Sequence, residues 1–145
     1  MIKILFVCTG NTCRSVMAEK ICNNLCKKNK FKIIAESAGI YANVGASATL
    51  ETVNALKKIK IRNIKHNSKQ FCLDELFYYD YCIALTQDIK KYIGNFNNVY
   101  CFADFIDSAV DVTDPFGQSQ QMYDLTCEQI KNYVQKLILK IGDSK

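Results

Sequence analysis

The chain has 145 residues, of which 49% are hydrophobic, so it can bury one core but is too short for two ordinary domains. No apolar run approaches the roughly 20 residues of a membrane span, and the N-terminal segment lacks the cleavage features of a signal peptide. The formal charge of +5 comes from scattered lysines without a nucleic-acid motif. We therefore expect one domain over residues 1–145 in the cytoplasm that binds neither nucleic acid nor membranes.

Apolar runs and helical periodicities alternate along the chain. In chain order, the pattern predicts a strand at 2–7, a helix at 15–28, a strand at 32–37, a helix at 47–58, a helix at about 69–77, a strand at 81–85, a short helix at 88–93 and a strand at 98–102. A long final helix is indicated by apolar side chains that recur about every 3.6 residues from Met122 to Ile141. This order predicts an α/β fold, a three-layer sandwich in which a four-stranded parallel sheet carries helices on both faces. Ligands of such folds bind at the carboxyl ends of the strands.

The loop after the first predicted strand has the composition of a phosphate-binding loop. Residues 8–15 are Cys-Thr-Gly-Asn-Thr-Cys-Arg-Ser, so a thiol ends the strand and an arginine begins the helix. Inward-facing backbone amides, the positive helix N-terminus and the Arg14 guanidinium would together bind a tetrahedral oxyanion such as phosphate. The same field stabilises the thiolate of Cys8, and Ser15 can donate its hydroxyl to that sulfur. The alternative is a buried cysteine beside an ordinary surface arginine, but the position directly after an apolar strand favours a functional loop.

Asp114 is the best candidate for an acid that protonates a leaving group. It lies in Val-Thr-Asp-Pro-Phe-Gly, residues 112–117, where the only proline of the chain and a glycine fix a turn before the final helix. Phosphoryl transfer to sulfur needs such an acid, and then a base that activates water against the phosphocysteine. Asp114 could equally serve only to initiate the turn, and the residues alone leave these two roles open.

Four motifs in a fixed order resemble those of a known family. They are Val-Cys-Thr-Gly-Asn-Thr-Cys-Arg-Ser at 7–15, Glu-Ser-Ala-Gly at 36–39, His-Asn-Ser-Lys-Gln at 66–70 and Asp-Pro-Phe-Gly at 114–117. Together they span essentially the whole chain, which resembles the low-molecular-weight protein tyrosine phosphatases. The resemblance implies that Cys8 is the nucleophile, that Arg14 holds the phosphate and the transition state, and that Asp114 is the general acid and then the base.

The resemblance also implies supporting roles. Ser37, Asn11 and His66 would hold the loop and force the asparagine into a strained, inward-facing conformation. Cys13 has a counterpart that can form a reversible disulfide with the nucleophile, which would make the enzyme redox-sensitive, although a packed thiol is an equally open alternative. The residues expected to contact the phosphate or the substrate are Thr9, Gly10, Asn11, Thr12, Cys13 and Ser15, with Phe116 at the pocket entrance. Val16 departs from the family, which usually has a proline there.

Two details resemble the bacterial protein-arginine phosphatase branch of this family, namely the loop sequence at 8–15 and the short turn at 114–117. Tyrosine-specific members tend to have an aliphatic residue in place of Thr12 and a longer aromatic turn. A hydroxyl at Thr12 would narrow and polarise the pocket wall, and Asp114 can hydrogen-bond a guanidinium. The resemblance implies phosphoarginine proteins as substrates, phosphotyrosine proteins as the alternative, and inorganic phosphate or another oxyanion as a ligand of the loop.

Two other classes of protein share parts of this pattern. Thioredoxin-coupled arsenate reductases have the first loop but need two further relay cysteines, whereas here Thr86 follows the third strand and Cys72 and Cys82 lie at the wrong places. A phosphocarrier of a sugar-transport system has a cysteine after its first strand but no use for Arg14 or Asp114. Both are weaker alternatives to hydrolysis.

The eight cysteines are spread along the chain, so most are expected to be reduced thiols in the core. Cys22 and Cys26 have a spacing that a metal could use. No second Cys/His pair follows them, however, and His66 is the only histidine. We expect no metal and no cofactor.

Overall fold

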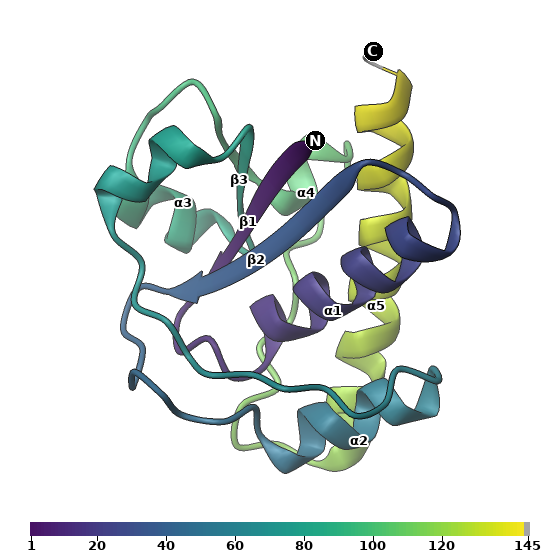
Figure 1. The fold of residues 1–145 in the computed structure, drawn as a ribbon. Helices are drawn as coiled ribbons and strands as arrows, with labels where there is room; N and C mark the ends of the chain where they lie inside the picture. Colours follow the sequence, from purple (N-terminus) through teal and green to yellow (C-terminus); the bar gives the residue numbers. More distant parts are fainter. Residues whose placement is uncertain (144–145) are drawn as a thin grey trace.

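The computed structural model describes residues 1–143 and is built around a four-stranded parallel sheet with the strand order β2-β1-β3-β4 (Figure 1). The strands are β1 (Ile2–Cys8), β2 (Ile33–Gly39), β3 (Tyr81–Ala84) and β4 (Val99–Cys101). The helices are α1 (Arg14–Lys28), α2 (Leu50–Lys58), the 3-10 helix η1 (Leu73–Tyr78), α3 (Gln87–Ile93), α4 (Phe102–Phe105) and α5 (Gln120–Asp143).

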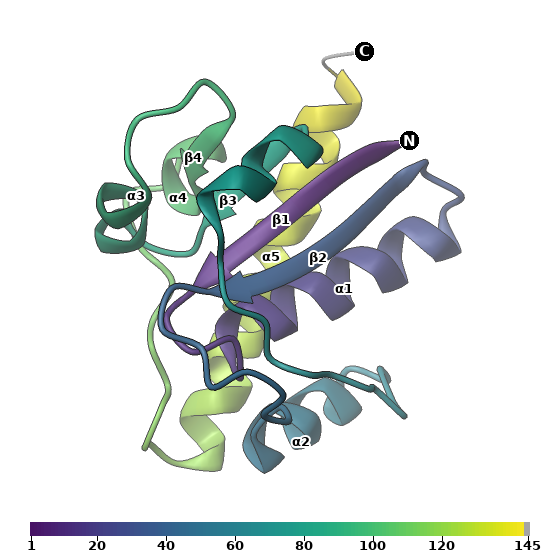
Figure 2. The same cartoon turned by 60° about the vertical axis from the view of Figure 1, so that its left-hand side comes forward.

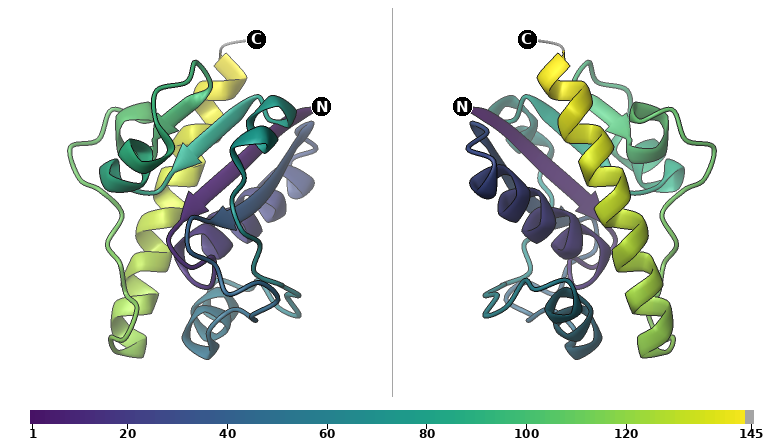
Figure 3. Two further views of the ribbon diagram at one scale, coloured as in Figure 1. Left: turned by 90° about the vertical axis from the view of Figure 1, so that its left-hand side faces the viewer. Right: turned by 90° about the vertical axis from the view of Figure 1, so that its right-hand side faces the viewer.

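Helices enclose the sheet from both sides. Helices α1 and α5 lie on one face and α3 lies on the other, as the opposite views in Figure 3 show. The central strand β1 is therefore covered on both faces, and residues 4–7 are fully buried, which explains its unbroken apolar run. The predicted α/β fold with a four-stranded parallel sheet is confirmed.

The segment predicted as a helix at about 69–77 is different in the structure. Its first part extends the sheet, because the Gly39 N–H donates to the Lys69 carbonyl at 2.9 Å and the Phe71 N–H donates to the Gly39 carbonyl at 2.8 Å. Backbone groups committed to β2 cannot also form helical hydrogen bonds, so only the 3-10 helix η1 follows, from Leu73. Figure 2 shows this segment running past the carboxyl ends of β1 and β2.

Several boundaries shift by one to three residues, among them the end of β2, which lies at Gly39 and not at residue 37. Helix α2 begins at Leu50 because Thr49 caps it, its hydroxyl accepting from the Thr52 N–H at 3.3 Å. The last strand ends at Cys101, and the unpredicted short helix α4 starts at Phe102.

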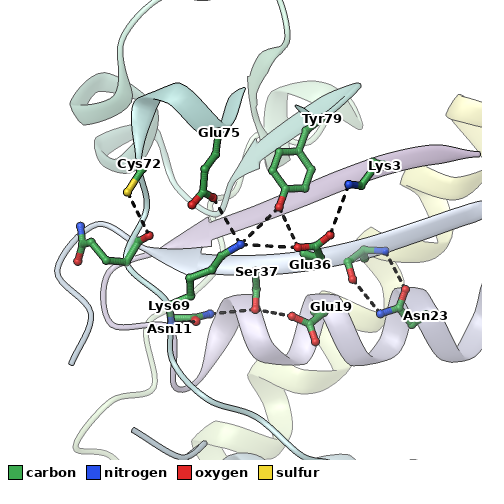
Figure 4. Close-up of polar contacts among 12 residues, drawn as sticks. Lys3, Asn11, Glu19, Asn23, Glu36, Ser37, Lys69, Cys72, Glu75 and Tyr79 are labelled. Carbon is green, nitrogen blue, oxygen red and sulfur yellow. Dashed lines mark hydrogen bonds and ion pairs between the residues drawn. The ribbon is translucent and has the colours of Figure 1, made fainter. Parts of the chain in front are cut away.

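The free edge of β2 is partly covered by a side chain of α1. The Asn23 amide donates to the Ala35 carbonyl at 2.9 Å and accepts from the Ala35 N–H at 2.8 Å (Figure 4). The segment at 69–71 covers the same edge further along, at Gly39. Edge strands otherwise offer unpaired groups to other chains, so these contacts protect the sheet.

The eight cysteines all lie within the described residues and are free thiols, and seven of them are buried whereas Cys72 is exposed. Within residues 1–143, none of the helices is long and apolar enough to cross a membrane.

Candidate active site

The candidate site lies at the carboxyl end of β1. Cys8 is the last residue of β1 and Arg14 is the first residue of α1, so the five residues between them form a tight loop at the edge of the sheet. This loop opens into a pocket with a volume of about 190 Å³. The pocket is lined by Cys8, Thr9, Gly10, Thr12, Cys13, Arg14, Asp114 and Phe116.

The loop rests on the end of β2. The Ile40 N–H donates to the Cys8 carbonyl at 3.0 Å, and the Tyr41 N–H donates to the Thr9 carbonyl at 2.9 Å. Gly39 makes this close approach possible, because a β-carbon there would lie 2.6 Å from the Thr9 carbonyl oxygen and 2.9 Å from the Asn11 nitrogen. Both atoms belong to the backbone, so they cannot swing aside, and a glycine is needed at the end of the strand.

Asn11 is the residue that fixes the shape of the loop. It is fully buried and has a φ of 58°, a left-handed conformation that is uncommon for a residue other than glycine. Its carbonyl accepts from His66 Nε2 at 2.6 Å and from Ser68 Oγ at 2.8 Å. Its side-chain Oδ1 accepts from the Lys69 N–H at 2.9 Å. The segment at 66–69 therefore holds both the backbone and the side chain of Asn11 in the strained conformation.

The side-chain amide of Asn11 also sets the direction of a chain of hydrogen bonds that ends at Cys8. Because a backbone N–H can only donate, Lys69 fixes Oδ1, and Nδ2 must then face the serines, donating to Ser37 Oγ at 2.9 Å and to Ser15 Oγ at 2.8 Å. Ser15 Oγ lies 2.9 Å from Cys8 Sγ. Since Ser15 accepts from Asn11, its own proton is free to point at the sulfur of Cys8.

A carboxylate terminates this chain at its other end. Ser37 Oγ donates to Glu19 Oε1 at 2.6 Å, so the lone pairs of Ser37 remain available to Asn11, as Figure 4 shows for these three residues. Glu19 also pairs with Lys20 at 2.8 Å. An ionised carboxylate only accepts, so Glu19 takes the hydroxyl hydrogen of Ser37 and leaves Ser37 Oγ to accept from Asn11. The other branch, from Asn11 through Ser15, points toward Cys8 Sγ.

Arg14 and Asp114 face each other across the pocket. Arg14 is 6% exposed, and its Nη2 lies 3.4 Å from Asp114 Oδ2, whereas the side chain of Asp114 is about half exposed. The other carboxylate oxygen of Asp114 accepts from the Phe116 N–H at 3.1 Å, which orients the group within its turn. The ring of Phe116 is exposed and lines the pocket. The buried guanidinium of Arg14 thus lies opposite the solvent-accessible carboxyl of Asp114.

Thr12 and Cys13 form the wall of the pocket on the side of α2. The Thr12 carbonyl accepts from the Thr49 N–H at 3.1 Å and from Thr52 Oγ1 at 3.2 Å, which ties the loop to the start of α2. Cys13 Sγ lies 3.6 Å from Thr49 Oγ1 and 3.5 Å from the Tyr123 hydroxyl. Burial and the contact with Cys13 raise the pKa of Tyr123 to about 12. Cys8 and Cys13 are both free thiols here, so the disulfide between them stays a prediction.

The structure brings the predicted residues together, with Cys8, Arg14 and Asp114 in one pocket and Ser37 and His66 behind the loop. Their catalytic roles stay a prediction. Sequence reasoning missed Glu19 and Ser68. Ser68 lies inside the motif at 66–70, and Glu19 lies four residues after Ser15, a spacing that places both on one face of a helix. Among residues 1–143, His, Cys, Asp and Glu form no group of three or more that could hold a metal ion.

The first loop of the parallel sheet brings a thiol and a guanidinium to the pocket, and the turn at 114–117 adds a carboxyl. This set of groups fits the class of phosphatases that use a cysteine nucleophile. Residues 3–145 match the family model described as low molecular weight phosphotyrosine protein phosphatase. The chain therefore belongs to the low molecular weight phosphotyrosine protein phosphatase family, and the resemblance found in its motifs is confirmed.

Relatives in this family carry different names. A protein from Bacillus subtilis (strain 168) named protein-arginine-phosphatase is 31% identical over 140 residues, which cover 92% of this chain and 93% of the relative. The structure of a low molecular weight protein tyrosine phosphatase from T. tengcongensis is 34% identical with a TM-score of 0.89, covering 97% of this chain and 99% of that one. A mutant of the YwlE arginine phosphatase with a phosphorylated active site serine is 28% identical with a TM-score of 0.91, covering 97% and 96%.

Proposed function

We propose that this chain hydrolyses phosphorylated protein in two steps through a phosphocysteine. In the first step, Cys8 Sγ attacks phosphorus, the bond from phosphorus to the leaving group breaks, and Asp114 donates a proton to the departing atom. In the second step, Asp114 takes a proton from water, the water oxygen attacks phosphorus, and the thiolate leaves. The observation that carries this proposal is the 2.9 Å contact of the buried Ser15 with Cys8, which itself lines a pocket together with Arg14 and Asp114.

The surrounding groups fit the charges of these steps. Arg14 offers two parallel N–H donors to the equatorial oxygens of phosphorus. The Ser15 hydroxyl stabilises the sulfur as it attacks and again as it leaves. The covalent phosphoenzyme in the solved YwlE mutant, which carries phosphate on its active site serine, supports the same course here. Inorganic phosphate, the product, is then expected to inhibit by occupying the loop.

We further propose that the preferred substrate is phosphoarginine rather than phosphotyrosine. Support comes from Thr12, whose side chain lines the pocket, and from the name of the Bacillus subtilis relative. The hydroxyl of Thr12 polarises the wall beside the substrate, and the carboxyl of Asp114 suits a guanidinium whose departing nitrogen needs a proton. We also infer a cytoplasmic location, because Cys8 must remain a reduced thiol to act.

Substrate preference can be tested with phosphate release from phosphoarginine and phosphotyrosine peptides. We expect the wild type to prefer phosphoarginine, and Thr12→Ile to move the ratio of kcat/KM toward phosphotyrosine by about tenfold or more. Thr12→Ser keeps the hydroxyl and is the matched control, so its ratio should stay near that of the wild type. A wild type that prefers phosphotyrosine, together with an unchanged Thr12→Ile, would show that the substrate assignment is wrong.

The mechanism has a separate test. We expect Cys8→Ser to lose turnover, and acid-quenched wild type to carry phosphate on sulfur. Full activity in Cys8→Ser would contradict the phosphocysteine mechanism for either substrate.

A further inference from the structure

The loop that carries Asp114 contributes little to the core. Val112 and Pro115 are buried, whereas Thr113, Asp114 and the stretch 116–119 are exposed. Few apolar contacts therefore hold this loop, and its place relative to the pocket depends on polar contacts with its neighbours.

Gln129 of α5 makes two such contacts immediately before Asp114. Its Oε1 accepts from the Thr113 N–H at 3.2 Å, and its Nε2 donates to the Asp111 carbonyl at 3.2 Å. In an extended chain, the carbonyl of residue i and the N–H of residue i+2, here Asp111 and Thr113, point to the same side, as they do where two strands pair. The amide of Gln129 therefore acts on the loop as a neighbouring strand would, and it needs both its donor and its acceptor.

Tyr133 makes a second contact one turn further along α5. Its hydroxyl donates to the Val110 carbonyl at 2.5 Å and lies 2.9 Å from Ser108 Oγ. Gln129 Nε2 lies 3.5 Å from the same hydroxyl. The ring of Tyr133 is buried and packs edge-on against Phe102 with centroids 5.5 Å apart. A side chain anchored in the core thus fixes the loop four residues before Asp114.

The opposite side of the loop is also held. Asp111 Oδ2 accepts from the Gln87 N–H at the start of α3, at 3.2 Å, and Asp111 Oδ1 lies 3.4 Å from Cys101 Sγ. Asp111 therefore makes hydrogen bonds to both α3 and α5, which fix this part of the loop between the two helices. The contacts of Asp111 and Thr113 therefore limit the positions that the next residue, Asp114, can take.

We propose that Gln129, assisted by Tyr133, is a positioning residue that holds Asp114 where it can protonate the leaving group. This inference rests on the proposed function, because it assumes that Asp114 is the general acid. Neither residue lines the pocket, so both act through the loop. Loss of the Gln129 amide should leave phosphate binding by residues 8–15 intact and impair proton transfer selectively.

The leaving group separates this role from a general loss of structure. Phenyl phosphate has a basic leaving group that needs a proton, whereas p-nitrophenyl phosphate has an acidic one that departs with little help. We expect Gln129→Met to lower kcat/KM for phenyl phosphate about tenfold and for p-nitrophenyl phosphate about twofold or less. Inhibition by inorganic phosphate should be unchanged. Tyr133→Phe, which removes one oxygen and keeps the ring, should change the two rates in the same direction by a smaller factor.

Two controls complete the experiment. Gln135→Met makes the same substitution at an exposed position of α5 and should leave both rates unchanged. Asp114→Asn should show the selectivity of Gln129→Met in a stronger form, and the double variant should be no more selective than Asp114→Asn alone. If the wild type releases phosphate neither from these esters nor from the phosphoarginine and phosphotyrosine peptides, the proposed function is wrong. If Asp114→Asn is selective but Gln129→Met and Tyr133→Phe lower both rates equally or not at all, only the positioning role is wrong.

Discussion

The substitution Gly39→Ala tests how closely the end of β2 packs against the backbone of the loop at residues 9–11. The added β-carbon would lie 2.6 Å from the Thr9 carbonyl oxygen, whereas ordinary contact begins near 3.4 Å, so the loop or β2 must move by about 0.8 Å. Overpacking of this kind costs about 1–3 kcal/mol of unfolding free energy. A misplacement of about 1 Å in a catalytic array costs about a hundredfold in rate. We expect kcat/KM of Gly39→Ala to fall by about ten- to a hundredfold and its melting temperature to fall by roughly 3–10 °C.

The assay is hydrolysis of p-nitrophenyl phosphate at 25 °C, where the variant stays folded, with circular dichroism as the measure of folding. Gly142→Ala is the matched control, because a β-carbon there meets no atom within 4 Å. It should keep full activity and gain at most about 0.5 kcal/mol in stability, since it replaces a glycine in the last turn of helix α5. If Gly39→Ala retains the kcat/KM and the phosphate inhibition constant of the wild type, the loop is not seated on this glycine as we argue.

Three further predictions concern the supports of the loop and the sheet. Asn11→Gly and Asn11→Ala should both lose the side-chain contacts and most of the activity. Chemical denaturation should show the alanine variant to be less stable than the glycine variant by about 1 kcal/mol, because glycine adopts a φ of 58° without strain. Equal stability of the two variants would contradict this. Burial and the hydrogen bond to Glu36 raise the pKa of Tyr79 from 10.0 to about 12, so this group stabilises the fold fully below pH 10, and the contribution is lost as the pH rises toward 12. Tyr79→Phe should therefore show a shallower alkaline decline in stability, and a decline identical to that of the wild type would refute the assignment. Asn23→Ala removes the side chain that covers the edge of β2, so it should aggregate faster than the neighbouring control Asn24→Ala, as measured by light scattering. Equal rates of aggregation would argue against edge protection.

Much of the fold follows from local periodicity. The strand β1 has an unbroken apolar run at residues 4–7, and α5 has apolar side chains every 3.6 residues, so both were predictable from the residues within them. The segment at 69–71 was not, because its conformation is decided by pairing with Gly39, some thirty residues earlier in the chain. A short window of sequence contains no sign of such a partner.

The candidate site divides in the same way. Cys8 and Arg14 could be inferred from their loop, because the physics of anion binding there is local to a strand end and a helix start. Asp114 needed the family resemblance, since nothing in its own turn indicates that it faces Arg14 at 3.4 Å. Glu19 was missed because its partner, Ser37, lies on a different element, and only the assembled structure shows which serine its carboxylate orients.

The seating of the loop on Gly39 has a consequence for inhibitors of this protein. The loop that lines the pocket is seated on the main chain at the end of β2, where the Ile40 and Tyr41 N–H groups donate to the Cys8 and Thr9 carbonyls. Resistance substitutions cannot easily remove such contacts without damaging the enzyme, so a phosphate mimic bound there would be durable but poorly selective among relatives with the same loop. Selectivity has to come from side chains that line the pocket, such as Thr12 and Phe116, and the proposed preference for phosphoarginine gives such a compound its direction. A compound that joins an anion to a guanidinium-like group would address both regions at once.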